Sequence, residues 1–344
     1  MTVFTTSHFA DHEQVVFASD AETGLRAVLA VHNTNRGPAL GGCRMWAYES
    51  EEAAIADVLR LSRGMTYKNA LADLPWGGGK SVIIADAKTD KTPEMMRAMG
   101  RAVERLGGRY IVAEDVGTTP DDMLAVSAET AHVRGVKGVG FDPSPATAFG
   151  CFVGIKRSVE ERLGRANLEG VKVAVQGLGH VGYDLAQQLR DAGADLVVSD
   201  IDEGAVARAK TELGATPVPF DQIYSQDVDV FAPCALGAIL NDQTIAQLKA
   251  KIVAGSANNQ LAEERHGQAL ADKGVLYAPD YVINAGGVIH IYHEGADYDR
   301  QAAFGHVGRI AETLGEIYER AAKNGEPTHV AADRIAEERF ANAA

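Results

Sequence analysis

The second half of the chain alternates short apolar runs with other segments, and this alternation limits the fold more than any other feature. The apolar runs are expected to form short strands at Val171–Gln176, Asp195–Asp200, Val228–Ala232, Ile252–Ala254 and Val275–Ala278. Helical or loop segments separate them, as expected for parallel strands joined by crossovers. The pattern therefore predicts a doubly wound α/β domain, followed by a helical tail from about residue 299 to 342.

The first of these runs leads directly into Gly177-Leu178-Gly179-His180-Val181-Gly182, with Asp200 at the end of the next strand. A G-x-G-x-x-G sequence between a strand and a helix allows a tight turn and close approach of a pyrophosphate. The helix N-terminus adds amide donors. This context predicts dinucleotide binding rather than a glycine turn of another α/β fold. Asp200 and Asp202, with no Arg or Lys between them, would repel a 2′-phosphate, which favours NAD over NADP.

The first part of the chain mixes strands and helices without this alternation. Strands are expected at Val15–Ser19, Leu25–Val31, Ala39–Trp46, Ser81–Ala85 and Tyr110–Ala113. Helices are expected to begin at Ser50-Glu51-Glu52, Thr92-Pro93-Glu94 and Thr119-Pro120-Asp121. The glycine-rich stretch Gly135–Gly140 indicates a domain boundary.

Two lysines in this first part, Lys68 and Lys80, flank a glycine run, and Lys80 follows Gly77-Gly78-Gly79 directly. The bare backbone allows another molecule to approach closely. In a cleft, desolvation and a second ammonium would lower the pKa of Lys80, and a neutral lysine accepts a proton. A nucleotide-binding P-loop would need a glycine where Leu74 stands, so that interpretation fails. A flexible loop with a solvated lysine remains the alternative from these residues alone.

Charge and cysteine usage restrict the class of protein. The net charge of −14 disfavours nucleic acid as a partner, because phosphates are bound by clustered cations. The three cysteines, Cys43, Cys151 and Cys234, are far apart, which indicates a reducing compartment rather than a disulfide framework. The N-terminus lacks signal-peptide features, and no apolar run is long enough to span a membrane. We therefore expect a cytoplasmic protein without a membrane partner.

Polar residues are expected at strand ends, where doubly wound sheets bind their ligands. Asn258, Asn259 and Asn284 would hydrogen-bond the nicotinamide ribose or a substrate carboxylate there, or else act as turn residues. Asp115 ends a strand of the first part, and it would either exchange a proton with a substrate amine or cap a turn. The segment His290–Glu294 contains only two histidines and one acid, so no metal site is expected.

Several longer motifs follow one another along nearly the whole chain. In order, they are Gly37–Gly42, Gly64–Asn69, Gly77–Lys80, Ala113–Thr119, Pro143–Ala148, Gly177–Gly182, Ala232–Gly237, Gly255–Gln260 and Tyr277–Gly287. With these motifs the chain resembles the amino-acid dehydrogenases of the glutamate/leucine/phenylalanine/valine family, and within it the leucine enzymes most. The resemblance implies a mixed-sheet substrate-binding and oligomerisation domain at 1–134 with 324–344. It also implies an NAD-binding Rossmann domain at 135–323, with a cleft between the two.

The same resemblance implies roles for individual residues. Lys80 would be the low-pKa base that activates water for attack on an imino acid, and Asp115 would exchange a proton with the amino group. The substrate carboxylate would be held by Lys68, assisted by Asn284 and the backbone of Gly41 and Gly42. The side-chain pocket would be formed by Leu40, Met65, Ala113 and Val288. The NAD site would comprise Thr147, Gly177, Leu178, Gly179, His180, Val181, Gly182, Asp200, Ala235, Leu236, Asn258 and Asn259.

The implied activity is the reversible, NAD-dependent oxidative deamination of a branched-chain L-amino acid, leucine preferred, to a 2-oxo acid and ammonia. Ala113-Glu114 is similar to the leucine enzymes, whereas Leu71–Pro75 is similar to the phenylalanine enzymes. A phenylalanine or other aromatic amino-acid dehydrogenase is therefore the alternative. A non-catalytic NAD-binding regulator would not need Lys68, Lys80 and Asp115 together.

The resemblance also implies a homo-oligomer. The leucine enzymes carry a longer tail beyond the counterpart of Ala336–Arg339, and that tail contributes to large assemblies. On this comparison we expect a dimer rather than an octamer.

Overall fold

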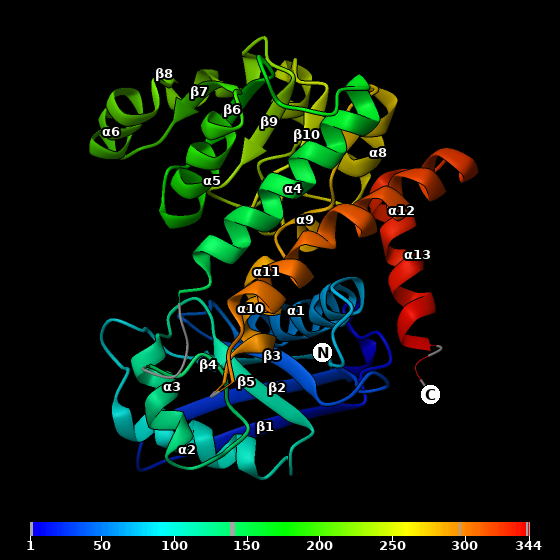
Figure 1. Ribbon diagram of the computed structural model, residues 1–344. Helices are drawn as coiled ribbons and strands as arrows, with labels where there is room; N and C mark the ends of the chain where they lie inside the picture. Colours follow the sequence, from blue (N-terminus) through cyan, green and yellow to red (C-terminus); the bar gives the residue numbers. More distant parts are fainter. Residues whose placement is uncertain (1–2, 138–141, 296, 342, 344) are drawn as a thin grey trace. The chain divides into compact units, whose positions relative to one another are not determined.

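The computed structural model describes residues 3–137, 142–295, 297–341 and 343 (Figure 1). The chain divides into two compact units. Unit 1 comprises Met1–Phe141, Ile291–Tyr298 and Ala336–Ala344, and unit 2 comprises Asp142–His290 and Asp299–Ile335. The predicted division instead assigned 291–298 to the second domain and 324–335 to the first. The expected boundary at Gly135–Gly140 lies partly outside the described residues.

Unit 1 is built around one mixed sheet. Its strands are β1 (Gln14–Asp20), β2 (Leu25–Asn33), β3 (Ala39–Trp46), β4 (Gly77–Ile84) and β5 (Tyr110–Glu114). Its helices are η1 (Val3–Thr5), α1 (Glu51–Leu71), α2 (Pro93–Glu104) and α3 (Pro120–Ser127). The strand order is β1-β2-β4-β3-β5, in which β2 is antiparallel to β1 and β4, while β3 is parallel to β4 and β5.

Helices cover both faces of this sheet, α1 on one and α2 with α3 on the other (Figure 1). Alternate residues of β2 point to opposite faces, as the pleat requires. On the α1 face, Val28, Ala30 and Val82 pack with Ala54, Val58 and Leu59. On the other face, Leu25, Ala27, Leu29 and Val31 pack with residues that include Met95, Met96 and Met99. Each face of the sheet therefore has its own apolar core.

The expected helix starts are confirmed by their caps. The side chain of Ser50 accepts a hydrogen bond from the amide of Ala53, and Thr92 accepts one from Met95. Thr119 and Asp122 form a reciprocal capping box at α3. Each cap satisfies an amide that has no partner within its helix.

The glycine run forms a strand and not a flexible loop. We expected a strand only from Ser81, but β4 begins at Gly77 and pairs with β2 and β3. Side chains are excluded here: a Cβ on Gly78 would overlap the backbone of Thr66, and one on Gly79 would lie 2.7 Å from the ring of Tyr110. Close packing therefore explains the glycines at this place.

Unit 2 contains the strands β6 (Lys172–Gln176), β7 (Asp195–Ser199), β8 (Thr216–Pro217), β9 (Val230–Pro233), β10 (Ile252–Val253) and β11 (Leu276–Tyr277). The helices before β9 are α4 (Ser144–Leu163), α5 (His180–Asp191), α6 (Glu203–Leu213) and η2 (Phe220–Ser225). The helices after β9 are α7 (Asp242–Gln247), α8 (Arg265–Asp272), α9 (Asp280–Ile283), α10 (Gly286–His293), α11 (Arg300–Gly308), α12 (Ile310–Asn324) and α13 (Thr328–Ala341). The division between the units falls within α10 and α13.

All strand pairs of this second sheet are parallel, in the order β11-β10-β9-β6-β7-β8. Numbered from β6, this is the doubly wound order of dinucleotide-binding folds, whose switch point lies between the first and fourth strands. The switch point here is between β6 and β9. The predicted α/β class, with one mixed and one doubly wound sheet, is confirmed. The two-residue strand β8 was not expected.

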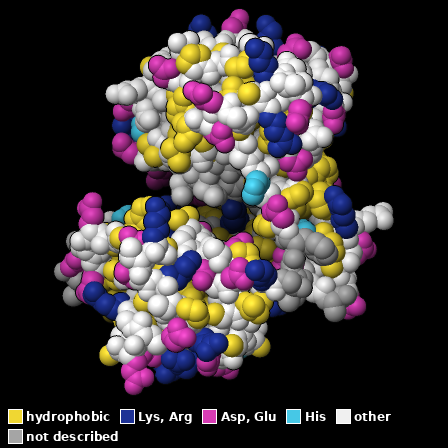
Figure 2. Space-filling view, turned by 90° about the vertical axis from the view of Figure 1, so that its left-hand side faces the viewer, with side chains coloured by type: hydrophobic (Ala, Val, Ile, Leu, Met, Phe, Trp, Pro, Cys, Tyr) yellow, Lys and Arg dark blue, Asp and Glu magenta, His cyan; other side chains and the backbone are white. Residues whose placement is uncertain are grey.

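Among the described residues, no helix has both the length and the apolar character that crossing a bilayer requires. On the face drawn in Figure 2, acidic and basic side chains are interspersed.

Candidate active site

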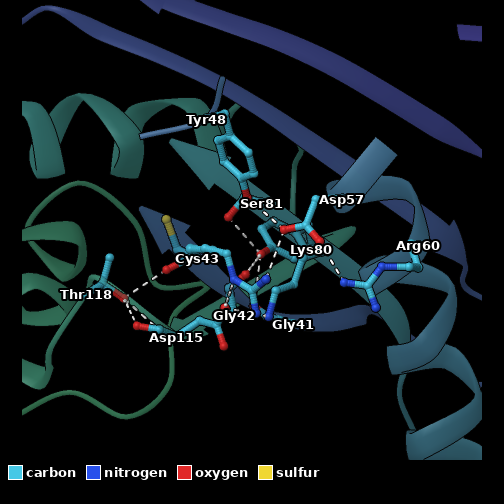
Figure 3. Close-up of polar contacts among 12 residues, drawn as sticks. Gly41, Gly42, Cys43, Tyr48, Asp57, Arg60, Lys80, Ser81, Asp115 and Thr118 are labelled. Atoms are coloured by element: carbon cyan, nitrogen blue, oxygen red, sulfur yellow. Dashed lines mark hydrogen bonds and ion pairs between the residues drawn. The ribbon is translucent and has the colours of Figure 1, made fainter. Parts of the chain in front are cut away.

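A buried ion pair joins Lys80 and Asp115 in unit 1. The Nζ of Lys80 on β4 lies 3.1 Å from Oδ2 of Asp115, which follows β5 directly (Figure 3). The side chain of Lys80 is 7% exposed. Lys80 is paired with Ala30, which belongs to the core on the α1 face, so Lys80 also faces α1. Two residues predicted to be catalytic from separate motifs therefore lie in contact.

Burial and neighbouring charges shift both groups. Desolvation lowers the pKa of Lys80, and Arg44 lowers it further, whereas Asp115 opposes the change. Burial alone would raise the pKa of Asp115, but Lys80 and Arg44 outweigh it, so the pKa lies below its ordinary value. The site thus favours a lysine that loses its proton easily beside an ionised carboxylate.

Bare backbone borders this pair on β3. A Cβ on Gly42 would lie 2.7 Å from Cβ of Asp115 and 3.1 Å from Nζ of Lys80, and one on Gly41 would overlap the carbonyl of Gly79. The buried hydroxyl of Tyr110 donates to the carbonyl of Gly41 at 2.9 Å and lies 3.0 Å from Oγ of Ser81. Burial raises the pKa of Tyr110, so the phenol keeps its proton. Tyr110 thereby holds β3 and β4 together beneath the ion pair.

The other residues predicted for the substrate site in unit 1 lie on elements around this pair. Met65 and Lys68, both partly exposed, belong to α1, which packs against β4. Leu40 on β3 and Ala113 on β5 are buried and aliphatic, and Ala113 is paired with Gly42. Asn69, beside Lys68, donates from Nδ2 to the carbonyl of Gly77 at 2.6 Å and ties α1 to the glycine run.

A set of polar residues around Asp115 was not expected from the sequence. Arg44 on β3 donates from Nε to Oδ2 of Asp115 and from Nη1 to Oδ2 of Asp57 on α1, both at 2.9 Å. The hydroxyl of Tyr48 donates to the same oxygen of Asp57 at 2.8 Å. The one signal in the sequence was a charged residue inside an otherwise apolar strand, two positions after Gly42.

In unit 2, the fingerprint turn lies at the switch point of the parallel sheet. Gly177 has a φ of +97°, which suits glycine, and a Cβ there would lie 2.8 Å from that of Ala235, after β9. Gly182 lies so close to the carbonyl of Gly177 that a Cβ would overlap it. The amide of Leu178 donates to Asp200 at the end of β7. The predicted association of the turn with the acidic residue is therefore present.

The start of α5 fits a dinucleotide. Gly179 is its N-cap without a side-chain cap, and a Cβ on Gly179 would meet no atom within 4 Å. His180 is exposed and Val181 is partly exposed in the first turn. Open space beside uncapped helix amides suits an anionic pyrophosphate.

The remaining predicted residues of unit 2 follow other strands and helices. Asn284 donates from Nδ2 to Oδ1 of Asn258 at 2.8 Å, and Asn259 has a φ of +51° in the same loop. Thr147 in the first turn of α4 lies 2.9 Å from where a Cβ of Gly287 would be, and Val288 is the next residue. Leu236, after β9, is 68% exposed. The described residues contain no group of three or more His, Cys, Asp or Glu arranged to hold a metal ion.

A doubly wound unit with a dinucleotide-type turn and a buried lysine–carboxylate pair together fit a nicotinamide-dependent dehydrogenase. Comparison with known proteins is more specific. Residues 12–132 match the Glu/Leu/Phe/Val dehydrogenase dimerisation domain, and residues 198–344 match the Glutamate/Leucine/Phenylalanine/Valine dehydrogenase domain. The chain belongs to this dehydrogenase family, which confirms the resemblance noted in its sequence.

Three relatives span nearly the whole chain. Leucine dehydrogenase of Bacillus cereus is 53% identical over 96% of this chain and 92% of its own length. L-tryptophan dehydrogenase of Nostoc punctiforme is 50% identical over 99% of this chain and 97% of its own length. A crystal structure of that enzyme matches this structure with a TM-score of 0.87 and covers 97% of both chains. Phenylalanine dehydrogenase of Bacillus thermotolerans is 48% identical over 96% of this chain and 89% of its own length. The protein is an L-amino-acid dehydrogenase that acts with a nicotinamide cofactor.

Gly42→Ala is expected to displace the ion pair, because the added methyl would press on Asp115 and Lys80. A displacement of about 1 Å costs on the order of 100-fold in rate. We therefore expect kcat/KM, followed by cofactor reduction, to fall by about that factor.

Gly64→Ala on α1 is the matched control, since its Cβ would meet nothing within 4 Å. It should keep its activity and gain up to about 1 kcal/mol in free energy of unfolding. Wild-type activity in Gly42→Ala would show that the site tolerates a side chain there.

Proposed function

We propose that the protein catalyses the reversible, NAD-dependent oxidative deamination of branched-chain L-amino acids, with leucine preferred. The products are a 2-oxo acid, ammonia and NADH. The observation that carries this proposal is the buried Lys80 in contact with Asp115 beside a bare glycine backbone. The aliphatic, buried Leu40 and Ala113, and the identity to a leucine dehydrogenase, support the substrate class.

Lys80 and Asp115 would divide the proton transfers between them. NAD, when bound, supplies the hydride acceptor that turns the amino acid into an imino acid. Lys80, whose pKa is lowered by burial, would take a proton from the water that adds to the imino carbon. Asp115 would exchange a proton with the nitrogen that leaves as ammonia. The two roles need one neutral and one ionised group, in agreement with the pKa directions.

Binding and orientation would fall to other residues. Lys68 would hold the α-carboxylate, with the backbone of Gly41 and Gly42 and with Asn284. Leu40, Met65, Ala113 and Val288 would surround the substrate side chain. This arrangement would orient Cα and leave the amino group beside Asp115.

For the cofactor, we propose the fingerprint Gly177–Gly182 with Asp200, Ala235, Leu236, Asn258, Asn259 and Thr147. The open space at Gly179 and the amides of α5 would receive the pyrophosphate. Asp200 would bind the ribose hydroxyls, and no cation stands between it and Asp202 to accept a 2′-phosphate. This favours NAD over NADP.

An aromatic amino acid is the second candidate substrate, since a tryptophan and a phenylalanine dehydrogenase are nearly as similar in sequence. A non-catalytic NAD-binding regulator is the candidate from another class. The lysine–carboxylate contact argues against it, because buried titratable groups with shifted pKa values are typical of functional sites.

A substrate panel tests the proposed function. NADH or NADPH formation would be followed with L-leucine, L-valine, L-phenylalanine, L-tryptophan and L-glutamate. We expect activity with NAD and a preference for leucine over valine of about 10-fold or more, the value of one methylene in an apolar pocket. Preference for an aromatic substrate would refute only the proposed pocket, whereas no turnover of any amino acid would refute the activity.

Lys80→Ala tests the base. Loss of a general base should lower kcat by about 10²–10⁴-fold, while NADH binding, measured by fluorescence titration, should stay unchanged. Lys88→Ala, at an exposed position, is the control. Near wild-type turnover in Lys80→Ala would show that another group activates the water.

Gly179→Ala tests the cofactor site. Its methyl would occupy the open space beside α5 without touching protein atoms. The melting temperature without cofactor should stay unchanged while the Kd for NADH rises about 10-fold, or about 1.4 kcal/mol. Gly305→Ala, also in open space, is the control. Equal NADH affinity in both variants would place the pyrophosphate elsewhere.

We also propose that the protein is a homo-oligomer, with a dimer favoured. The match of residues 12–132 to a domain described as a dimerisation domain supports this. Multi-angle light scattering of the purified protein should give the mass of two chains. The mass of one chain would refute the oligomer, and that of eight chains would refute the dimer.

A further inference from the structure

Arg44 lies between two carboxylates that come from different elements of unit 1. It stands on β3, and its side chain is 20% exposed. Nε donates to Oδ2 of Asp115 and Nη1 donates to Oδ2 of Asp57. A guanidinium is planar, so binding two carboxylates through different nitrogens fixes its orientation as well as its position.

Asp57 is itself held by more than Arg44 (Figure 3). The hydroxyl of Tyr48 donates to Oδ2 and Nη2 of Arg60 donates to Oδ1, both at 2.8 Å. Burial alone would raise the pKa of Asp57, but these donors and Arg44 lower it below its ordinary value. An ionised, immobilised Asp57 therefore anchors the outer end of Arg44.

At the inner end, Arg44 and Lys80 both meet the same oxygen of Asp115. Their nitrogens lie 2.9 and 3.1 Å from Oδ2. Within the described chain, no donor is found on Oδ1. The backbone of Asp115 is also held, since its amide donates to Oγ1 of Thr118, which donates to the carbonyl of Cys43. Asp115 is thus fixed with one oxygen occupied and the other able to meet an amine.

We propose that Arg44 is a positioning residue of the reaction, which holds Asp115 by Oδ2 and places a fixed positive charge beside Lys80. This inference rests on the roles proposed for Lys80 and Asp115. By itself, an ionised Asp115 would stabilise the protonated lysine and so oppose its use as a base. Arg44 competes for the same oxygen and offsets that attraction.

The other groups near Lys80 do not replace this effect. Burial raises the pKa of Cys43 to about 12, and it also raises the pKa of Tyr110 well above its ordinary value, so both groups stay neutral. Asp57 is negative and raises the pKa of Lys80. Arg44, in contrast, is a cation whose charge lowers the pKa of Lys80. The titratable and charged neighbours are Asp115 after β5, Arg44 and Cys43 on β3, Asp57 on α1 and Tyr110 on β5.

The test compares Arg44→Met, Arg44→Lys and Arg60→Met. For each, the pH dependence of kcat/KM for L-leucine would be measured. The pH dependence of carbamylation of Lys80 by cyanate, quantified by mass spectrometry of the peptide, would report the same lysine without turnover. Melting temperatures would show that each variant is folded.

In Arg44→Met the lost cation should raise the pKa of Lys80. The midpoints of the pH dependence of kcat/KM and of carbamylation should therefore both move upward by about one pH unit, the size of shift that a nearby charge produces. Arg44→Lys keeps the charge but cannot bridge two carboxylates, so its midpoint should stay near that of the wild type while kcat falls. Arg60→Met, which changes a donor on the far oxygen of Asp57, should alter neither midpoint.

A purely structural role of Arg44 would lower the melting temperature and leave the carbamylation midpoint in place, which would overturn the inference. If Arg44→Met does not fold, the kcat of Arg44→Lys tests the inference instead. A wild-type kcat in Arg44→Lys would also overturn the positioning role of Arg44. A shifted carbamylation midpoint with an unchanged activity profile would support the effect of Arg44 and refute Lys80 as the base.

Discussion

The buried contact between Lys80 and Asp115 is the interaction on which the rest of the site depends. Removing two charges from water costs several kcal/mol per ion, so they persist only with additional partners. Arg44, anchored by Asp57, supplies that partner on the carboxylate side. The contact therefore requires β3, β4, α1 and the end of β5 to meet within a few ångströms, and the mixed sheet of unit 1 brings them there.

The close approach of these elements in turn requires glycines, which have no side chain, in β3 and β4. Gly41 and Gly42 on β3, and Gly77–Gly79 on β4, lie against backbone, the ring of Tyr110 or the ion pair itself. A glycine-rich strand is intrinsically weak, because glycine loses more backbone entropy than other residues. Here the hydroxyl of Tyr110 and the amide of Asn69 bind glycine carbonyls and offset part of that weakness. The same packing that holds the strands together leaves a bare surface beside Lys80.

Much of this architecture was predictable, because it rests on local patterns. β3 runs from Ala39 to Trp46 as expected, the caps at Ser50 and Thr119 start their helices, and the fingerprint leads to Asp200. The predicted start of β4 was wrong because glycine has a low strand preference, and only tertiary packing shows why glycines are needed in this strand. The network of Arg44, Tyr48 and Asp57 was missed for a related reason, since ion pairs depend on elements that are distant in sequence. The assignment of 291–298 to unit 1 likewise follows from packing between segments that are distant in sequence.

Lys80 is expected to give up its proton more easily than an ordinary lysine, despite its contact with a carboxylate. NMR of the wild-type protein labelled with carbon-13 at lysine Cε would measure this, with the Lys80 signal assigned through Lys80→Arg. We predict a titration midpoint clearly below the ordinary lysine value of 10.5. A midpoint at or above that value would mean that Asp115 keeps Lys80 protonated, and would contradict the account.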